Sequence, residues 1–302
     1  MGYALLFSGQ GMQHAAMLPW LTQDALVAQT CTELGVTDWR AELQDARWSF
    51  RNVNAQVLLT GINLAAWGQL SAALPAPAAV AGYSVGELAS FAAAGVFGAT
   101  TALSLAGARA RAMDHCAVTA PGGLMAVSGL APAQVEDVCA AFGIALAIDN
   151  DSHAVVLGGP VAALDAAVTE IGTHGAHCTR LHVGLASHTH WMDRAVPEFA
   201  QALAAYSVRA PRVALFSNAL DRVMHAAQVE PALSQQIAST VRWSRCMENI
   251  HARRVSCVLE VGPGAALARM WNQRFPHVPA RSADEFSSAA AVTDWVLRQC
   301  RD

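Results

Sequence analysis

The chain has 302 residues, of which 54% are hydrophobic and 14% charged, so it is long enough for one large domain or two unequal ones and too apolar for intrinsic disorder. All 19 basic residues are arginine, they form no basic run, and the formal net charge is −4, so nucleic-acid binding is not expected. Because lysine is absent, catalysis through a lysine Schiff base is excluded.

The cysteines and the N-terminus indicate a cytoplasmic protein. The seven cysteines are scattered and contain no C-x-x-C pair, as is typical of reduced thiols, and the segment MGYALLFSG lacks the basic region of a signal peptide. The uncharged stretch 90–108 is long enough to span a bilayer, but its glycines, threonines and alanines favour two short buried helices joined at residues 95–100. We therefore expect no membrane association.

Apolar runs bounded by glycine or proline alternate with longer segments of helical periodicity, which predicts an α/β protein with a largely parallel sheet. The first third of the chain predicts strands over 3–7 and 78–82, a helix over 53–74 and a further helix from Val85.

The pattern changes near Pro121. The predicted elements are then strand 124–130, helix 132–142, strand 144–148, strand 154–158, helix 161–173 and strand 178–183. This βαββαβ order is ferredoxin-like. Long helices and short strands follow, with strands at 213–216 and 255–261 the clearest. We expect a discontinuous large domain, residues 1–122 and 188–302, and an inserted small domain, residues 123–187.

The pentapeptide Gly82-Tyr83-Ser84-Val85-Gly86 lies between a predicted strand and a predicted helix. A serine on such a sharp turn is exposed at the sheet's carboxyl edge, and the N–H of the next residue, Val85, points to where an oxyanion forms. The alternative is a glycine-rich turn with an incidental serine. The strand-to-helix context favours Ser84 as a nucleophile.

A serine nucleophile needs a base, usually histidine. Most of the 11 histidines look like surface or loop residues, but His188 and His190 lie in a polar segment directly after a predicted strand, and position alone leaves both as candidates. A His-x-His pair also suits a metal, but no third ligand has matching spacing, so we expect no metal site.

A second glycine-rich turn, 7–13, follows the first strand. In a parallel sheet it reaches the same edge as Ser84, where the Gln10 N–H is a candidate second oxyanion donor. A dinucleotide-binding turn is the alternative, but position 14 is His14, so G-x-G-x-x-G is not satisfied.

Six ordered motifs give the chain a family resemblance. They are Phe7 to Gln13, Gly82 to Gly86 with its continuation to Val96, the helix around Arg109 and Met113, Ser187-His188 with Met192, Gln236 seven residues before Trp243, and Glu260 to Gly264. With these motifs the chain resembles the malonyl-CoA:acyl-carrier-protein transacylases of fatty acid and polyketide synthesis. The resemblance implies an α/β-hydrolase-like large domain with a ferredoxin-like insert.

The resemblance also implies the site residues. Ser84 is the nucleophile, His188 the base, and the N–H groups of Gln10 and Val85 the oxyanion hole. A main-chain carbonyl near Gln236 takes the place of an aspartate, Met113 shares the Arg109 helix face, and Asn218 matches a family position near the site, although it is also a turn-capping residue.

Arg109 would bind the free carboxylate of the malonyl group, for which a planar guanidinium is well suited. Arg111 is the rival, but it lies about 200° from Arg109 around a helix, so only one of them faces the pocket. Without the resemblance, Arg109 would be interpreted as a surface arginine.

Two residues depart from the family pattern. Tyr83 replaces the histidine that usually precedes the nucleophile, which narrows the pocket or brings a hydroxyl near the acyl group. Leu185 stands where methylmalonyl-selective domains have tyrosine. We still favour malonyl, because Arg109 selects a carboxylate and nothing makes room for a branch.

The mechanism implied is ping-pong, through a malonyl-serine. Malonyl-CoA is the expected donor, and the acceptor is phosphopantetheine on an acyl carrier protein that is met in trans. The chain itself is expected to bind no cofactor and to be a monomer. Exposed arginines are candidates for docking the acidic carrier, namely Arg242, Arg245, Arg253 and Arg254.

Alternatives remain open from the sequence. A serine hydrolase or thioesterase would share the Ser84 turn but has no use for Arg109, and a non-catalytic docking subunit would keep the fold without the chemistry. Fatty acid synthesis, polyketide synthesis and malonate decarboxylase are all possible settings, and Tyr83 inclines the interpretation towards the malonate decarboxylase component.

Overall fold

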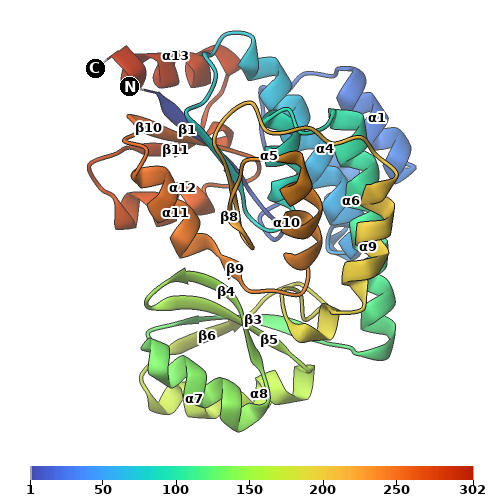
Figure 1. The fold of residues 1–302 in the computed structure, drawn as a ribbon, viewed down its shortest axis with the longest axis vertical. Coiled ribbons are helices and arrows are strands. Elements are labelled where there is room, and N and C mark those ends of the chain that lie inside the picture. The colour runs from blue at the N-terminus through green and yellow to red at the C-terminus, as the bar shows by residue number, and fades with distance from the viewer. Residues whose placement is uncertain (1, 302) are drawn as a thin grey trace.

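The computed structural model describes residues 2–301, which form two β-sheets surrounded by helices (Figure 1). The strands are β1 (Tyr3–Phe7), β2 (Ala79–Gly82), β3 (Gly123–Ser128), β4 (Ala145–Asp151), β5 (Ala154–Gly159), β6 (His177–Arg180), β7 (Leu215–Ser217), β8 (Asp221–Val223), β9 (Val241–Arg242), β10 (Cys257–Val261) and β11 (Ala280–Ser282). The α-helices are α1 (Ala25–Leu34), α2 (Trp39–Glu42), α3 (Ala46–Ser49), α4 (Asn52–Ser71), α5 (Gly86–Ala93), α6 (Ala99–Thr119), α7 (Pro132–Phe142), α8 (Val161–Thr173), α9 (Ala195–Ala204), α10 (Val229–Gln235), α11 (Trp243–His251), α12 (Ala266–Arg274) and α13 (Ala289–Arg301). Three one-turn 3-10 helices are η1 (His190–Met192), η2 (Ala226–Gln228) and η3 (Ala283–Glu285).

The large sheet has the order β11-β10-β1-β2-β7-β8 and is parallel except for β8. Strand β1 is buried on both faces, which explains why it is a continuous apolar run rather than an alternating one. Phe7 pairs with Gly82 on one side and with Val261 on the other. The turns that follow β1, β2 and β10 therefore meet at one edge of the sheet.

Helices cover the two faces of the large sheet unequally. One face packs against α1, α4, α5, α6, α9 and α13 in the largest apolar core. The other face shares a second core with α11, α12 and the inner face of the small sheet, where Leu6 belongs to the same cluster as Trp243, Leu124 and Ile148. This second core therefore joins the large sheet to the small sheet.

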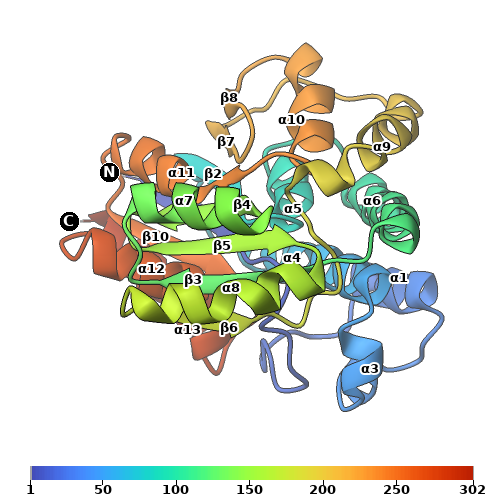
Figure 2. The ribbon, with the colours of Figure 1, turned by 90° about the horizontal axis from the view of Figure 1, so that it is seen from below.

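The small sheet has the order β6-β3-β5-β4-β9, with α7 and α8 packed on the face turned away from the large sheet (Figures 1 and 2). The first four strands and two helices have the predicted ferredoxin-like order. Strand β9, which comes from the C-terminal half of the chain, adds in parallel to β4 and was not predicted.

The predicted fold class is confirmed, and most element bounds agree within three residues. Helices 132–142 and 161–173 occur as predicted, and the stretch 90–108 divides between α5 and α6. The strand predicted over 178–183 ends at Arg180, although the Leu181 N–H still donates to the Leu124 carbonyl on β3 at 3.0 Å; Leu181 and Val183 line a cavity. Within residues 2–301 no helix is both long and apolar enough to cross a bilayer.

Candidate active site

Ser84 lies on a strained turn between β2 and α5. Its φ of 53° is in the left-handed region, where a residue with a side chain costs about 1–3 kcal/mol. Two side chains hold the turn: Asn218 Oδ1 accepts from the Ser84 N–H at 3.0 Å, and Gln236 Nε2 donates to the Ser84 carbonyl at 2.7 Å. At Gly86 a Cβ would lie 2.4 Å from the Phe7 carbonyl oxygen, so only glycine allows the turn to approach β1 this closely.

His188 faces Ser84 across 104 residues of sequence. Its Nε2 lies 2.7 Å from Ser84 Oγ, and its Nδ1 lies 2.7 Å from the main-chain carbonyl oxygen of Gln236. A carbonyl only accepts, so Nδ1 carries the proton and Nε2 accepts from the serine hydroxyl. The backbone is fixed as well, because the His188 N–H donates to Ile237 at 2.8 Å. The geometry is that of a serine-histidine pair oriented by a carbonyl.

The environment of His188 keeps its imidazole neutral. Its pKa is lowered from the ordinary value to about 3: burial is the main cause, the nearby Arg109 charge acts in the same direction, and the hydrogen bond to the Gln236 carbonyl opposes both. The ring is therefore unprotonated at neutral pH and has a free lone pair on Nε2.

This low pKa predicts that the rate of Ser84 acylation stays unchanged at an unusually low pH. With p-nitrophenyl acetate, which carries no carboxylate, we expect the acylation rate to stay constant from pH 8 down to 5. An ordinary imidazole, with pKa near 6.5, would lose half its activity near pH 6.5. In Arg109→Gln the fall of the acylation rate at acid pH should begin at a higher pH than in the wild type, because a cation that lowers the pKa of His188 has been removed. A wild-type midpoint near 6.5 in stopped-flow measurements would contradict the assignment.

Arg109 is a buried cation whose hydrogen-bonded partners are neutral. The residue is 3% exposed, and its two terminal nitrogens donate to Gln56 Oε1 and Gln236 Oε1, each at 2.7 Å. Burial lowers its pKa to about 10, with Glu87 opposing, so the guanidinium remains charged at neutral pH. Burying a charge is costly unless it is paired, so this cation is suited to an anionic group of a ligand. Arg111, its rival, is exposed.

A line of side-chain amides connects Arg109 with the reacting pair. Gln236 accepts from Arg109 through Oε1, donates to the Ser84 carbonyl through Nε2 and orients His188 through its main-chain oxygen. Behind the guanidinium, Gln56 Nε2 contacts Met113 Sδ at 3.5 Å. Gln236 and Met113, both predicted as supporting residues, therefore surround Arg109.

Asn218 is held from the opposite side by a buried glutamate. Asn218 Nδ2 donates to the Gly82 carbonyl at 2.9 Å, and its own N–H donates to Glu87 Oε1 at 2.7 Å. Burial is the main cause that raises the pKa of Glu87 to about 8, and the Asn218 N–H and the charge of Arg109 act in the opposite direction. Within residues 2–301 the Glu87 carboxyl bonds to the Asn218 N–H and forms no ion pair with Arg109.

A cavity of about 230 Å³ opens in front of Ser84 and His188. Gln10, Met12 and Tyr83 line it, as does an apolar wall from the small sheet that comprises Leu124, Ala126, Ile148 and Val156. Among the described residues the lining includes neither Arg109 nor Gln236, so the guanidinium connects with the cavity through the bonds of Gln236 to Ser84 and His188.

The two predicted oxyanion donors lie on loops that touch. A Cβ at Gly9 would be 2.6 Å from the Tyr83 carbonyl oxygen, which places the loop after β1 against the turn that carries Ser84. Within residues 2–301 neither the Gln10 nor the Val85 N–H donates to another protein atom. Both N–H groups are available to a ligand.

Tyr83 connects the nucleophile turn with the small sheet. Its hydroxyl donates to Asn150 Oδ1 on β4 at 3.0 Å, and its ring meets Trp243 edge-on at a centroid distance of 5.3 Å. Burial raises the pKa of Tyr83, so the phenol stays protonated. The hydroxyl thus bridges the two sheets.

The Tyr83–Asn150 bond predicts energetic coupling between the two sheets. Tyr83→Phe and Asn150→Ala should each lower the free energy of unfolding by about 1–2 kcal/mol, and the double variant should lose clearly less than the sum, because one bond is shared. Urea denaturation measures this cycle. Tyr3→Phe, which removes a distant hydroxyl bonded to Pro75, is the control and should add to Asn150→Ala. Additivity of Tyr83→Phe with Asn150→Ala would contradict the coupling.

Some predicted candidates do not join the site. His190 is exposed and packs on Trp191 at 3.8 Å between ring centroids. The arginines expected to dock a carrier protein lie outside the cavity: Arg242 and Arg245 form ion pairs with Asp221 at 3.5 Å and Glu248 at 3.7 Å, and Arg253 and Arg254 are exposed. Across residues 2–301 no three metal-binding side chains come together.

Three site residues were missed by the sequence analysis: Gln56, Glu87 and Asn150. Gln56 had a signal, because it is a polar residue directly before the apolar run Val57–Leu59 in helix α4. Glu87 had one too, because it follows the nucleophile turn directly. Asn150 had none, since only the folded chain brings β4 to Tyr83.

Comparisons with known proteins agree with this architecture. Residues 4–296 match the family model described as the acyl transferase domain. The malonyl CoA-acyl carrier protein transacylase of Mycobacterium tuberculosis is 31% identical over 291 residues, covering 92% of this chain and 95% of that protein; the enzyme of the same name from Escherichia coli is 28% identical and covers 97% and 99%.

Solved structures give the same result. The acyl-carrier-protein S-malonyltransferase from Burkholderia pseudomallei superposes with a TM-score of 0.88 at 28% identity, covering 97% of this chain and all of that one. The malonyl CoA-acyl carrier protein transacylase from Coxiella burnetii gives 0.90 at 25% identity, with 99% and 98% covered. The chain therefore belongs to the malonyl-CoA:acyl-carrier-protein transacylase family of acyl transferase domains.

Proposed function

We propose that this protein moves a malonyl group from malonyl-CoA to the phosphopantetheine thiol of an acyl carrier protein, through a malonyl ester of Ser84. The observation that carries the proposal is Arg109, a buried guanidinium bonded to two neutral amides and linked through Gln236 to Ser84 and His188. A serine-histidine pair alone serves many acyl groups, whereas a buried cation beside it favours an acyl group with its own carboxylate.

In the first half-reaction, His188 Nε2 takes the hydroxyl proton of Ser84 as Oγ attacks the thioester carbonyl. The carbonyl oxygen becomes an oxyanion that accepts from the N–H groups of Gln10 and Val85. The C–S bond then breaks, His188 returns its proton to the sulfur, and CoA leaves as the thiol. Arg109 holds the malonyl carboxylate throughout and orients the carbonyl.

The second half-reaction repeats these steps in reverse with a different thiol. The phosphopantetheine thiol of the carrier gives its proton to His188 and attacks the ester carbonyl of malonyl-Ser84. The proton then passes to Ser84 Oγ, which is the leaving group. The apolar wall of Leu124, Ile148 and Val156 disfavours water in the cavity and so supports transfer over hydrolysis.

The acceptor and its approach follow from the relatives and the cavity. The curated relatives are transacylases of acyl carrier protein, and we extend this partner to the present chain. Residues of both proposed domains, 1–122 with 188–302 and 123–187, line the cavity, so a phosphopantetheine arm would enter between them. The free cysteines support a cytoplasmic location, where carrier and CoA occur together.

A transfer assay tests this proposal. The protein is incubated with malonyl-CoA and a holo carrier protein, and malonyl-carrier, CoA and free malonate are quantified by mass spectrometry. We expect malonyl-carrier and CoA in equal amounts with little malonate. Malonate formed as fast as CoA would indicate a hydrolase, and no turnover by a folded protein would indicate a non-catalytic role.

A further inference from the structure

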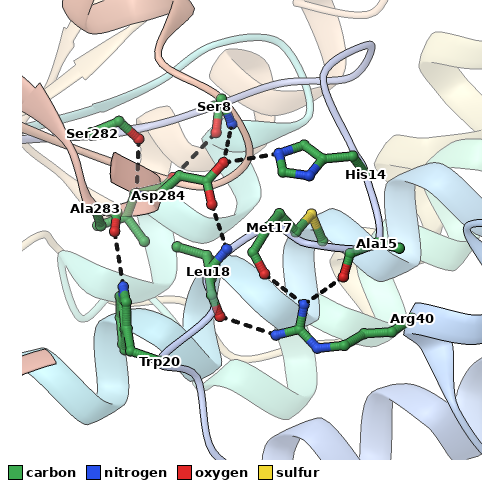
Figure 3. Close-up of polar contacts among 12 residues, drawn as sticks. Ser8, His14, Ala15, Met17, Leu18, Trp20, Arg40, Ser282, Ala283 and Asp284 are labelled. Atoms are coloured by element: carbon green, nitrogen blue, oxygen red, sulfur yellow. Dashed lines mark hydrogen bonds and ion pairs between the residues drawn. The ribbon is translucent and has the colours of Figure 1, made fainter. Parts of the chain in front are cut away.

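Asp284 is a buried carboxylate that joins separate segments of the chain outside the reacting pair. It lies in η3, after β11, and its side chain is 7% exposed. Oδ1 accepts from the Leu18 N–H, while Oδ2 accepts from the Gly264 N–H at 2.7 Å and lies 3.0 Å from His14 Nε2 (Figure 3). One carboxylate thus binds two loops that are about 245 residues apart in sequence.

The first of these loops carries the candidate oxyanion donor. The chain has no helix or strand between Phe7 and Ala25, and this stretch contains both Gln10 and Met12, which line the cavity. Leu18 has a φ of 49°, a left-handed conformation that needs support. A loop without regular structure depends on side-chain contacts to hold its backbone amides in place.

Arg40 completes the support of this loop. Its guanidinium donates to the carbonyl oxygens of Ala15 and Met17 at 2.8 and 2.6 Å and of Leu18 at 3.0 Å (Figure 3). Asp284 therefore accepts from an N–H of the segment 15–18, and Arg40 donates to carbonyl oxygens of the same segment. The two side chains together hold the backbone of this segment in place.

The second loop forms the neighbouring rim of the cavity. Gly264 follows β10 and leads into α12, whose Ala266 and Leu267 line the cavity. The Met12 side chain packs on Gly264, since a Cβ there would lie 3.1 Å from Met12 Cε. Asp284 thus bonds to Gly264 on one side of this contact and, on the other, to His14 and Leu18, which follow Met12 in the chain.

We propose that Asp284 is a positioning residue for the oxyanion hole, which holds the loop after β1 so that the Gln10 N–H meets the oxyanion. The inference rests on the proposed acyl-serine chemistry but not on malonyl as the acyl group. Removing an oxyanion donor typically costs 10²–10³-fold in rate, so displacing one is expected to cost about 10- to 100-fold.

The test is Asp284→Asn. This change keeps the shape of the side chain but replaces one of the two accepting oxygens with an NH₂ group, which donates. Either Leu18 or Gly264 then has its N–H facing an NH₂ group, so one bond to the loops is lost. The measurement is the pre-steady-state burst of p-nitrophenol from p-nitrophenyl acetate, corrected with Ser84→Ala, and the same burst of CoA from malonyl-CoA. The control is Asp294→Asn, the same change at an exposed aspartate on α13.

We expect the burst rate constant of Asp284→Asn to fall about 10- to 100-fold with both acyl donors and the burst amplitude to stay near one per chain. The control Asp294→Asn should remain within about twofold of wild type. A variant that is merely destabilised would lower the amplitude and leave the rate constant unchanged. That outcome, or a loss with malonyl-CoA alone, would overturn the inference. Failure of malonyl-CoA as a substrate would refute the proposed function and leave the ester test of Asp284 valid.

Discussion

Replacing Ser84 by alanine should abolish covalent acylation and lower transfer from malonyl-CoA by on the order of 10⁴-fold or more. The reason is chemical: no other hydroxyl lies within hydrogen-bond distance of His188 Nε2, as far as residues 2–301 are concerned. Intact-mass spectrometry after brief incubation with malonyl-CoA measures the adduct, and thiol release measures the rate.

Ser187 is the matched control, because it lines the same cavity and adjoins His188. Ser187→Ala should keep the full adduct, and peptide mapping should place the acyl group on the peptide that contains Ser84. An adduct that survives Ser84→Ala, or maps to Ser187, would contradict the assignment of the nucleophile.

Replacing Arg109 by alanine should remove the preference for malonyl. Truncating one partner of a buried, hydrogen-bonded charge pair costs about 2–5 kcal/mol, which corresponds to roughly 30- to 4,000-fold in kcat/KM for malonyl-CoA. Acetyl-CoA has no carboxylate for Arg109 to bind, so its kcat/KM should change far less. The quantity to measure is the ratio of the two kcat/KM values.

Arg111→Ala provides the control on the same helix, because that side chain is exposed and two residues away. Its selectivity should equal that of the wild type. Equal losses with malonyl-CoA and acetyl-CoA in Arg109→Ala would mean that Arg109 supports the fold around Gln236 and does not bind the carboxylate.

The sequence predicted those parts of the fold that depend on local pattern. The helix that begins at Pro132 and the βαββαβ order have signals within a few residues, and the turn at Ser84 is encoded by flanking glycines and a preceding apolar strand. The two-residue strand β9 has no such signal, because its pairing with β4 joins residues about 90 positions apart.

The candidate site shows the same division. Ser84 and His188 were predicted from motifs, and the structure places them 2.7 Å apart. The partners of Arg109 were not predicted, because helical spacing indicates which face a residue occupies but not which side chain of another helix it meets. Gln56 on α4 reaches Arg109 on α6 only through the packing of these helices.

The polar network around Ser84 explains how a strained turn persists in an apolar core. Asn218 and Gln236 bind the two peptide groups of Ser84, and Glu87 holds Asn218 in turn. Buried side chains that bond one another and the backbone through several atoms restrict each other to one arrangement. The same side chains that stabilise the turn therefore place Ser84 Oγ opposite His188 and near Arg109.

We propose that Ser84 carries the acyl group and that Arg109 selects it. One measurement tests both parts of this proposal. The protein is incubated for seconds with an equal mixture of malonyl-CoA, methylmalonyl-CoA and acetyl-CoA, and its intact mass is measured before and after a holo carrier protein is added. We predict a dominant malonyl adduct that persists in buffer and disappears when the carrier is added. A dominant acetyl adduct would contradict the role of Arg109, and an adduct that the carrier thiol does not remove would contradict transfer through Ser84.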